Sequence, residues 1–102
     1  MSYRVTLAAQ SDIEEIVSFL WQENPKAAEQ VENRLYEAFD LLADNPGLGH
    51  KRPDLTDRPV LFWPVNQTPY AAIYRAASPL EIVRVIHWRR DIVSLLGDAR
   101  SL

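Results

Sequence analysis

The sequence predicts an α+β fold in which an N-terminal helical hairpin packs on a mainly antiparallel four-stranded sheet. Two helix-periodic apolar stripes follow each other in the first half of the chain, separated by a short break. Three β-like segments joined by short turns follow in the second half, which is typical of an antiparallel meander. A short alternating segment precedes the helices, so the expected order is β-α-α-β-β-β-α, ending in a short C-terminal helix.

The first predicted elements are a strand and a helix. Residues Tyr3–Leu7 alternate between apolar and polar side chains, which predicts a strand. Ser11 is followed three residues later by Glu14, a capping-box pattern that predicts a helix from about Asp12 to about Glu23. We expect Trp21 to lie in the core, because it continues this helix's apolar spacing.

The second helix is predicted from its cap. Asn24 can cap it, Pro25 suits its first position, and its stripe runs to about Asp44. Since the connection is very short, the two helices should form an antiparallel hairpin. The stripe contains Ala28, Val31, Leu35, Ala38, Phe39 and Leu42.

Three strands are predicted after the hairpin, at Val60–Val65, Tyr70–Arg75 and Leu80–His87. Pro64 places its end of the first of them at an edge or a bulge. The run Leu80–His87 has apolar residues at both alternating sets of positions, so we expect it to be central and packed on both sides. A short helix is predicted at Asp91–Leu96, before a glycine.

Strict alternation would divide the central strand into two faces. Arg84 would then need a carboxylate partner, since an unpaired buried charge is costly, and Glu81 or Asp91 could supply it. One face would carry Leu80, Ile82, Arg84 and Ile86, and the other Glu81, Val83, Val85 and His87.

Composition and charge limit the possible functions. The chain has 102 residues, 47% hydrophobic and 25% charged, which indicates one soluble domain over residues 1–102. No apolar run approaches the ~18 residues of a membrane span, and no signal peptide is apparent, so we expect a cytoplasmic protein without membrane contact. With two histidines and no cysteine, we expect no metal and no cofactor.

The charge is unevenly placed along the chain. Residues 1–50 carry three Lys or Arg against nine acids, whereas residues 51–102 carry eight against five. This polarity predicts a basic face built from the second half. The net charge of −3 argues against a protein whose main role is to bind a phosphate backbone.

The order of elements and several segments resemble the ParE toxins of the RelE/ParE superfamily over nearly the whole chain. The segments are Pro46–Leu55, Val60–Val65, Ile73–Arg75, Pro79–His87 and Arg90–Ile92. Trp88 departs from the pattern, because the position after His87 is commonly glycine in these toxins.

The resemblance implies a bacterial toxin of a type II toxin–antitoxin module that traps the cleaved DNA complex of DNA gyrase and is not itself an enzyme. It also implies a hetero-oligomer with a cognate antitoxin whose tail folds over the toxin, so DNA would be reached only through the antitoxin or gyrase. From the charge, such a tail should carry acids and apolar anchors, docking at the strand edge next to Pro64 or between hairpin and sheet. The candidate partner-binding residues are Lys51, Arg52, Arg58, Trp63, Arg75, Arg84, His87, Trp88, Arg89 and Arg90.

Two alternatives stay open. A RelE-type, ribosome-dependent mRNA endonuclease would need cations and an acid or base, for which Arg75, Arg84 and His87 are the candidate catalytic residues. RelE-type enzymes usually carry more Lys and Arg and often a C-terminal tyrosine, and no tyrosine follows His87 here. The second alternative is an inactive toxin that only binds its antitoxin and co-represses its operon.

Overall fold

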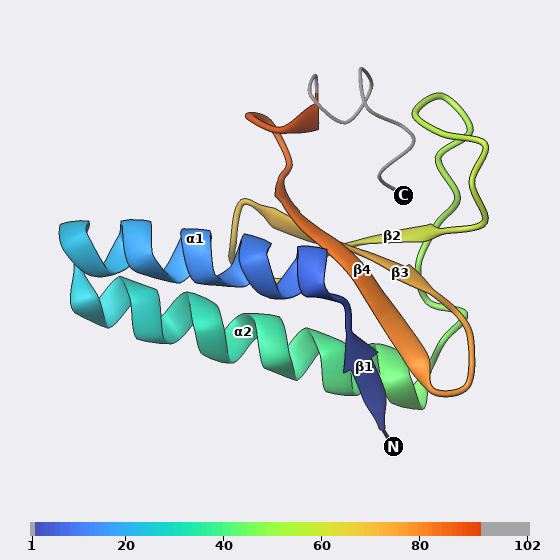
Figure 1. Cartoon of the computed structure of the whole chain (residues 1–102), viewed down its shortest axis with the longest axis horizontal. Coiled ribbons are helices and arrows are strands. Elements are labelled where there is room, and N and C mark those ends of the chain that lie inside the picture. Colours follow the sequence, from blue (N-terminus) through green and yellow to red (C-terminus); the bar gives the residue numbers. More distant parts are fainter. Residues whose placement is uncertain (1, 93–102) are drawn as a thin grey trace.

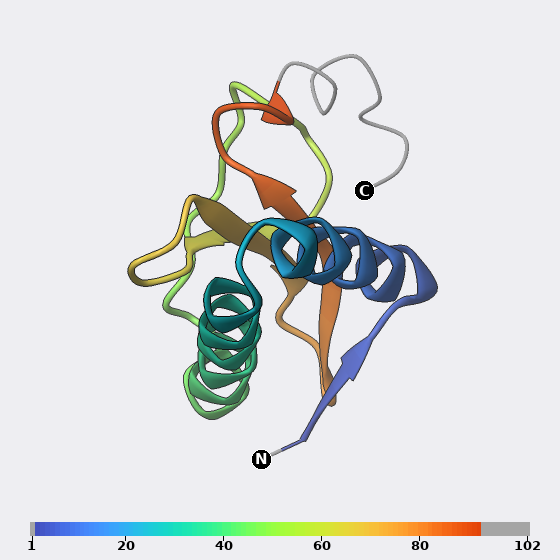
Figure 2. The same cartoon turned by 90° about the vertical axis from the view of Figure 1, so that its left-hand side faces the viewer.

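The computed structural model of the chain describes residues 2–92 and confirms the α+β arrangement. Figure 1 shows two adjacent helices on one side of the strands, and Figure 2 shows the same two coils nearly end-on. The predicted helix Asp91–Leu96 lies largely outside the described residues. The elements are β1 (Tyr3–Val5), α1 (Leu7–Glu23), α2 (Pro25–Asp44), β2 (Leu61–Pro64), β3 (Tyr70–Arg75) and β4 (Leu80–His87).

The four strands form one sheet in the order β1-β4-β3-β2. β1 runs parallel to β4, and the other neighbouring pairs are antiparallel. The central place of β4 and the edge place of β2, which ends at Pro64, are as predicted. The outer edge of β2 is partly occupied, because His50 and Phe62 exchange two backbone hydrogen bonds of 2.9 and 2.8 Å.

A bulge in β4 corrects the predicted division of its faces. Ile73 pairs with Arg84 but Tyr74 pairs with Ile82, so Val83 has no partner on β3. Beyond this extra residue the alternation is reversed. As a result, Val85 packs on the side of the helices and Ile86 on the opposite side, the reverse of the expectation from strict alternation.

The start of α1 also differs from the prediction. The N-cap is Thr6, whose hydroxyl accepts a 3.1 Å hydrogen bond from the Ala9 amide, so the prediction that Ser11 caps the helix is wrong. The same hydroxyl donates to the Val83 carbonyl at 2.9 Å. This contact with β4 favours Thr6, and the helix therefore begins five residues earlier than the predicted Asp12.

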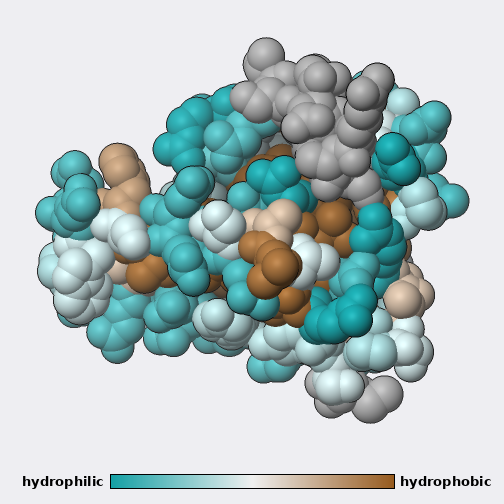
Figure 3. All heavy atoms as spheres, viewed as in Figure 1, coloured by the Kyte–Doolittle hydropathy of each residue, from teal (hydrophilic) through white to brown (hydrophobic). Residues whose placement is uncertain are grey.

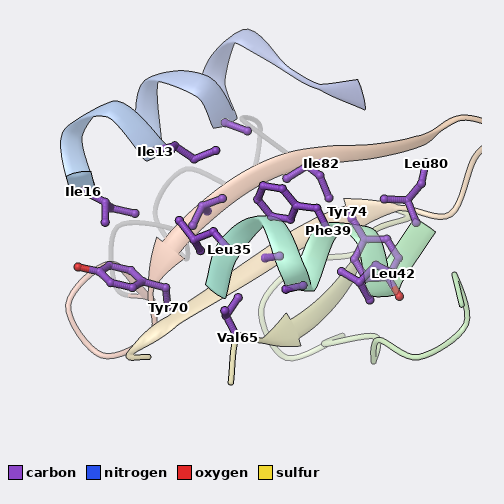
Figure 4. Close-up of a cluster of buried hydrophobic side chains, with 14 residues drawn as sticks. Ile13, Ile16, Leu35, Phe39, Leu42, Val65, Tyr70, Tyr74, Leu80 and Ile82 are labelled. Carbon is purple, nitrogen blue, oxygen red and sulfur yellow. The ribbon is translucent and has the colours of Figure 1, made fainter. Parts of the chain in front are cut away.

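The sheet face that the helices cover, here called the helix face, contains the larger core. Phe39 of α2 is fully buried and makes edge contacts with Tyr3 and Tyr36, at ring-centroid distances of 5.5 and 5.6 Å. Figure 4 shows Phe39 and Leu35 between the hairpin and the strands. The hairpin and the apolar stripe of α2 are thus as predicted, because residues of this stripe, such as Leu35, Phe39 and Leu42, pack against side chains of the strands.

Trp21 does not belong to this core. Its side chain is 58% exposed, so the prediction that it is buried is wrong. At 100° per residue, Trp21 lies outside the stripe formed by Ile13, Ile16 and Leu20, and it is not part of the core cluster on this face. Figure 3 shows that apolar atoms reach the surface in separate patches between hydrophilic side chains.

The opposite sheet face, here called the loop face, has a smaller cluster and no helix of the hairpin over it. Leu55, from the loop over residues 50–60, packs against this cluster, as does Ile92. Apolar residues therefore cover both faces of β4, as predicted. The cluster consists of Val60, Phe62, Ala71, Ile73, Val83 and Ile86.

Candidate partner-binding surface

A pocket of about 290 Å³ opens on the loop face beside β2. Phe62 and Ala71 reach it from two paired strands, and Trp88 follows the end of β4. The loop after α2 supplies the remaining wall. Three segments far apart in the sequence therefore meet here: the lining is His50, Arg52, Phe62, Pro64, Ala71 and Trp88.

Arg52 and Trp88 form the wall of this pocket together. The Arg52 guanidinium carbon lies 4.9 Å from the centre of the Trp88 ring, a cation–π contact. Trp88 also meets Phe62 edge to face, with ring centroids 6.3 Å apart. Arg52 donates two hydrogen bonds to Asp54, of 2.9 and 2.7 Å, and these bonds lower the pKa of the Asp54 carboxyl. Both partners fix the orientation of the arginine.

Further basic side chains follow the pocket residues in the chain. Lys51, Arg58 and Arg89 are exposed, and within residues 2–92 none of them forms an ion pair. Arg90 is also exposed and contacts Asp91 at 3.3 Å. Lys51 and Arg89 adjoin Arg52 and Trp88 in the sequence, so the segments that supply the pocket wall are rich in cationic residues.

Arg84 forms an ion pair, but its partner is neither Glu81 nor Asp91. Its Nε and Nη2 donate to the two carboxylate oxygens of Asp12 at 2.7 and 3.0 Å, and the Val85 amide donates to the same carboxylate at 3.0 Å. Asp12 takes this place because α1 crosses β4 at the bulge. The pair is only partly exposed, at 27% and 12%, and it fastens the helix to the sheet.

His87 closes the turn that follows β4. Its Nδ1 accepts a 3.0 Å hydrogen bond from the Arg90 amide, and its own amide donates to the Asp91 carboxylate at 2.8 Å. The ring meets Tyr70 edge to face at 5.5 Å. Trp88 fits this turn without a left-handed backbone, because Gln67 is the only non-glycine residue with positive φ among residues 2–92.

Arg75 lies at the other end of the paired strands. It contacts Glu81 at 2.7 Å, and Arg4 donates to the same carboxylate from β1. The hydrogen bonds from Arg4, and then from Arg75, lower the pKa of Glu81. Arg75 is paired with Glu81, which lies six residues before His87 on β4. At ~3.3 Å per residue, Arg75 and His87 are therefore about 20 Å apart along the strands.

The structure therefore does not gather the three side chains considered for RNA cleavage. Trp63 is also separate from the pocket, because it packs against the helix-face core. Of the predicted residues, Arg52 and Trp88 line the pocket, and Lys51 and Arg89 are their neighbours in the sequence. Sequence reasoning missed His50, Phe62, Pro64 and Ala71 as lining residues, because only the strand register shows that they meet.

Residues 2–92 contain neither a metal-binding cluster nor a membrane-spanning helix. No group of three His, Asp or Glu side chains there is placed to hold a metal ion. None of the described helices is long and apolar enough to cross a membrane. The pocket itself combines apolar side chains of the sheet with the cationic side chain of Arg52.

Comparisons with known proteins agree with this arrangement. A family model described as the ParE toxin of the type II toxin–antitoxin system parDE matches residues 3–92. The chain is 31% identical over 84 residues to a Sinorhizobium fredii protein named "Putative toxin Y4kP", covering 82% of this chain and 84% of that protein. A structure of the chromosomal ParDE system from P. aeruginosa is similar in fold, with a TM-score of 0.70 and 22% identity, over 85% of this chain and 95% of the other.

Proposed function

The chain belongs to the ParE toxins of type II toxin–antitoxin systems, and from this we propose that it inhibits DNA gyrase by binding and is neutralised by a cognate antitoxin. Both the target and the antitoxin would be met in the bacterial cytoplasm. The toxin would then form a hetero-oligomer with the antitoxin and reach DNA only through its partners.

The observation that carries this proposal is the pocket on the loop face with its cationic neighbours. Arg52 and Trp88 are of the residue types that contribute most at protein interfaces. The exposed Lys51, Arg58 and Arg89 would add electrostatic attraction to an acidic partner. This surface supports recognition of a macromolecule, and we assign the predicted partner-binding role chiefly to it.

The side chains considered for catalysis support binding over RNA cleavage. Arg84 is engaged by Asp12, and His87 accepts a backbone hydrogen bond within its turn. Arg75 lies at the opposite end of the strand pair. We therefore propose structural roles for these three residues, in tying α1, the turn and β1 to the sheet.

The proposal is tested by adding the purified protein to purified gyrase and following supercoiling and DNA cleavage. We expect supercoiling to stop and linear, protein-linked DNA to accumulate. The variants Arg75→Ala and His87→Ala should inhibit gyrase like the wild type, provided that their thermal unfolding shows a folded protein.

A gyrase that is indifferent to the folded wild-type toxin would contradict the proposal. Translating ribosomes are then the next substrate, since cleavage of mRNA that His87→Ala abolishes would establish the endonuclease alternative. If neither gyrase nor ribosomes respond while the antitoxin still binds, the chain is a toxin that only co-represses.

A further inference from the structure

The pocket beside Trp88 has the size of an inserted side chain. Its volume of about 290 Å³ lies at the lower limit of small-molecule sites, which span roughly 300–1,000 Å³. Phe62, Pro64 and Ala71 make its lining apolar on the side of the sheet. One or two apolar side chains of a docked protein segment would fill this space.

The basic residues in the segments around the pocket favour a negatively charged partner. Arg52 forms part of the wall, and the segments that supply Arg52 and Trp88 also carry the exposed cations Lys51 and Arg89. Asp54 is already bound by Arg52 through two hydrogen bonds. A segment that carries carboxylates on either side of an apolar anchor therefore complements this site in charge as well as in shape.

The strand edge next to the pocket limits how a partner can bind. The N–H and the carbonyl of Phe62 are both bonded to His50, and Pro64 has no N–H to offer. A partner cannot add a continuous strand along β2 under these conditions. Recognition at this site must depend on side chains, which makes the pocket more important than the edge.

We propose that the pocket receives an apolar side chain from an acidic segment of the antitoxin, and that Trp88 and Arg52 make it selective for that antitoxin. This inference rests on the proposed neutralisation by an antitoxin. Charge and shape favour the antitoxin as the occupant, because its tail is expected to carry acids and apolar anchors, which match Arg52 and the apolar lining of the pocket.

The test uses the full-length toxin and the purified antitoxin encoded beside it, titrated by calorimetry. We expect Trp88→Ala to raise Kd by about 30-fold, the effect of an interface hot spot, and Arg52→Ala by about 5-fold, since Asp54 already neutralises part of its charge. Trp88→Phe should recover most of the affinity, because it restores an aromatic wall for the pocket.

Matched controls are available on the hairpin. Trp21→Ala removes another exposed tryptophan, and Lys26→Ala removes an exposed cation at the start of α2. Both lie at the end of the hairpin that Figure 1 shows far from β2, so their Kd should stay within about twofold of the wild type. Thermal unfolding of every variant separates lost binding from lost structure.

Two outcomes would overturn the inference. One is a Kd for folded Trp88→Ala that equals that of Trp21→Ala. The other is a Trp88→Ala toxin that binds antitoxin normally but no longer inhibits gyrase, which would assign the pocket to the target.

The readouts also distinguish this inference from the proposed function. A wild-type toxin that does not inhibit gyrase contradicts the gyrase proposal, while the antitoxin titration still decides the role of the pocket. Failure of the folded wild type to bind the antitoxin would overturn both the inference and the proposed neutralisation. NMR gives a direct view, since the Trp88 indole N–H should shift on binding and the Trp21 indole N–H should not.

Discussion

The two faces of the sheet are built by different means. The helix face is packed by both helices of the hairpin, with large side chains such as Phe39 and Leu42 fully buried. The loop face has a smaller apolar cluster, a loop in place of a helix, and an open pocket. We conclude that one face supplies most of the stability, and that the other is free to present a binding surface.

The same strands serve both faces through alternating side chains. On β2, Phe62 faces the pocket while Trp63 packs under the helices. On β3, Ala71 lines the pocket while the adjacent Ala72 is buried in the helix-face core. Neighbouring residues should therefore respond differently to substitution, and this makes the comparison testable.

The largest expected effect is on the helix face. Phe39→Ala should lower the free energy of unfolding by about 3–5 kcal/mol, because it leaves a cavity between α2 and the sheet. Phe62→Ala should cost less, about 2 kcal/mol, because the space it leaves joins an open pocket that water can enter. Urea unfolding of the two variants measures both changes.

This pair of variants tests whether the helix face contributes more to stability than the loop face. A loss in Phe62→Ala equal to or greater than that in Phe39→Ala would mean that the loop face is as important for stability as the helix face. Phe39→Leu serves as a control, since it should keep most of the buried volume and hence most of the stability.

An intermediate effect is expected where the two faces are joined. Tyr74 is buried on the helix face, and its hydroxyl donates to the Pro46 carbonyl at 2.7 Å and accepts from the Gly49 amide at 2.8 Å. A Cβ on Gly49 would come within 2.6 Å of the Tyr74 ring. Gly49→Ala should therefore cost about 1–3 kcal/mol by displacing the loop or the tyrosine.

Gly47 provides the matched control for this prediction. A Cβ there would meet nothing within 4 Å, so Gly47→Ala should leave the urea midpoint nearly unchanged. If the two alanine variants unfold at the same urea concentration, the close approach to Tyr74 does not anchor the loop.

Local signals explain what could be predicted from the sequence. The cap Asn24, followed by Pro25 and a long apolar stripe, defines α2 from within its own segment, and the structure confirms its bounds. The strands β3 and β4 are likewise bounded by nearby prolines and turns. These elements depend mainly on residues next to each other in the chain.

The parts that were missed depend on distant contacts. Thr6, and not Ser11, caps the helix because its hydroxyl also donates a hydrogen bond to the Val83 carbonyl. Arg84 pairs with Asp12, which is 72 residues away in the sequence. Both contacts lie at the bulge in β4, which no local pattern indicates. The pocket was missed for the same reason, since its lining comes from three segments that only the sheet register brings together.

The smallest expected effect concerns the ion pairs near β1. Glu81 alternates with Leu80 and Ile82, so it faces away from the helices, where its carboxylate joins Arg4 and Arg75 across three strands. Because Arg4 is exposed, Glu81→Gln should cost no more than about 1 kcal/mol at pH 7. The matched control is an exposed carboxyl outside this network, removed by Glu29→Gln on α2.

The pH dependence of this variant gives the sharper test. The arginines lower the pKa of Glu81 from its ordinary value of 4.5, so its contribution is present above that pH and is lost as the pH falls through the lower, folded-state value. Melting temperatures between pH 7 and pH 3 should therefore show a difference between wild type and Glu81→Gln that is constant near neutrality and shrinks in acid. A difference that instead grows in acid would show that the carboxylate does not stabilise the loop face through charge. The Glu81 side chain would then stabilise the loop face by packing, which is also how side chains stabilise the helix face.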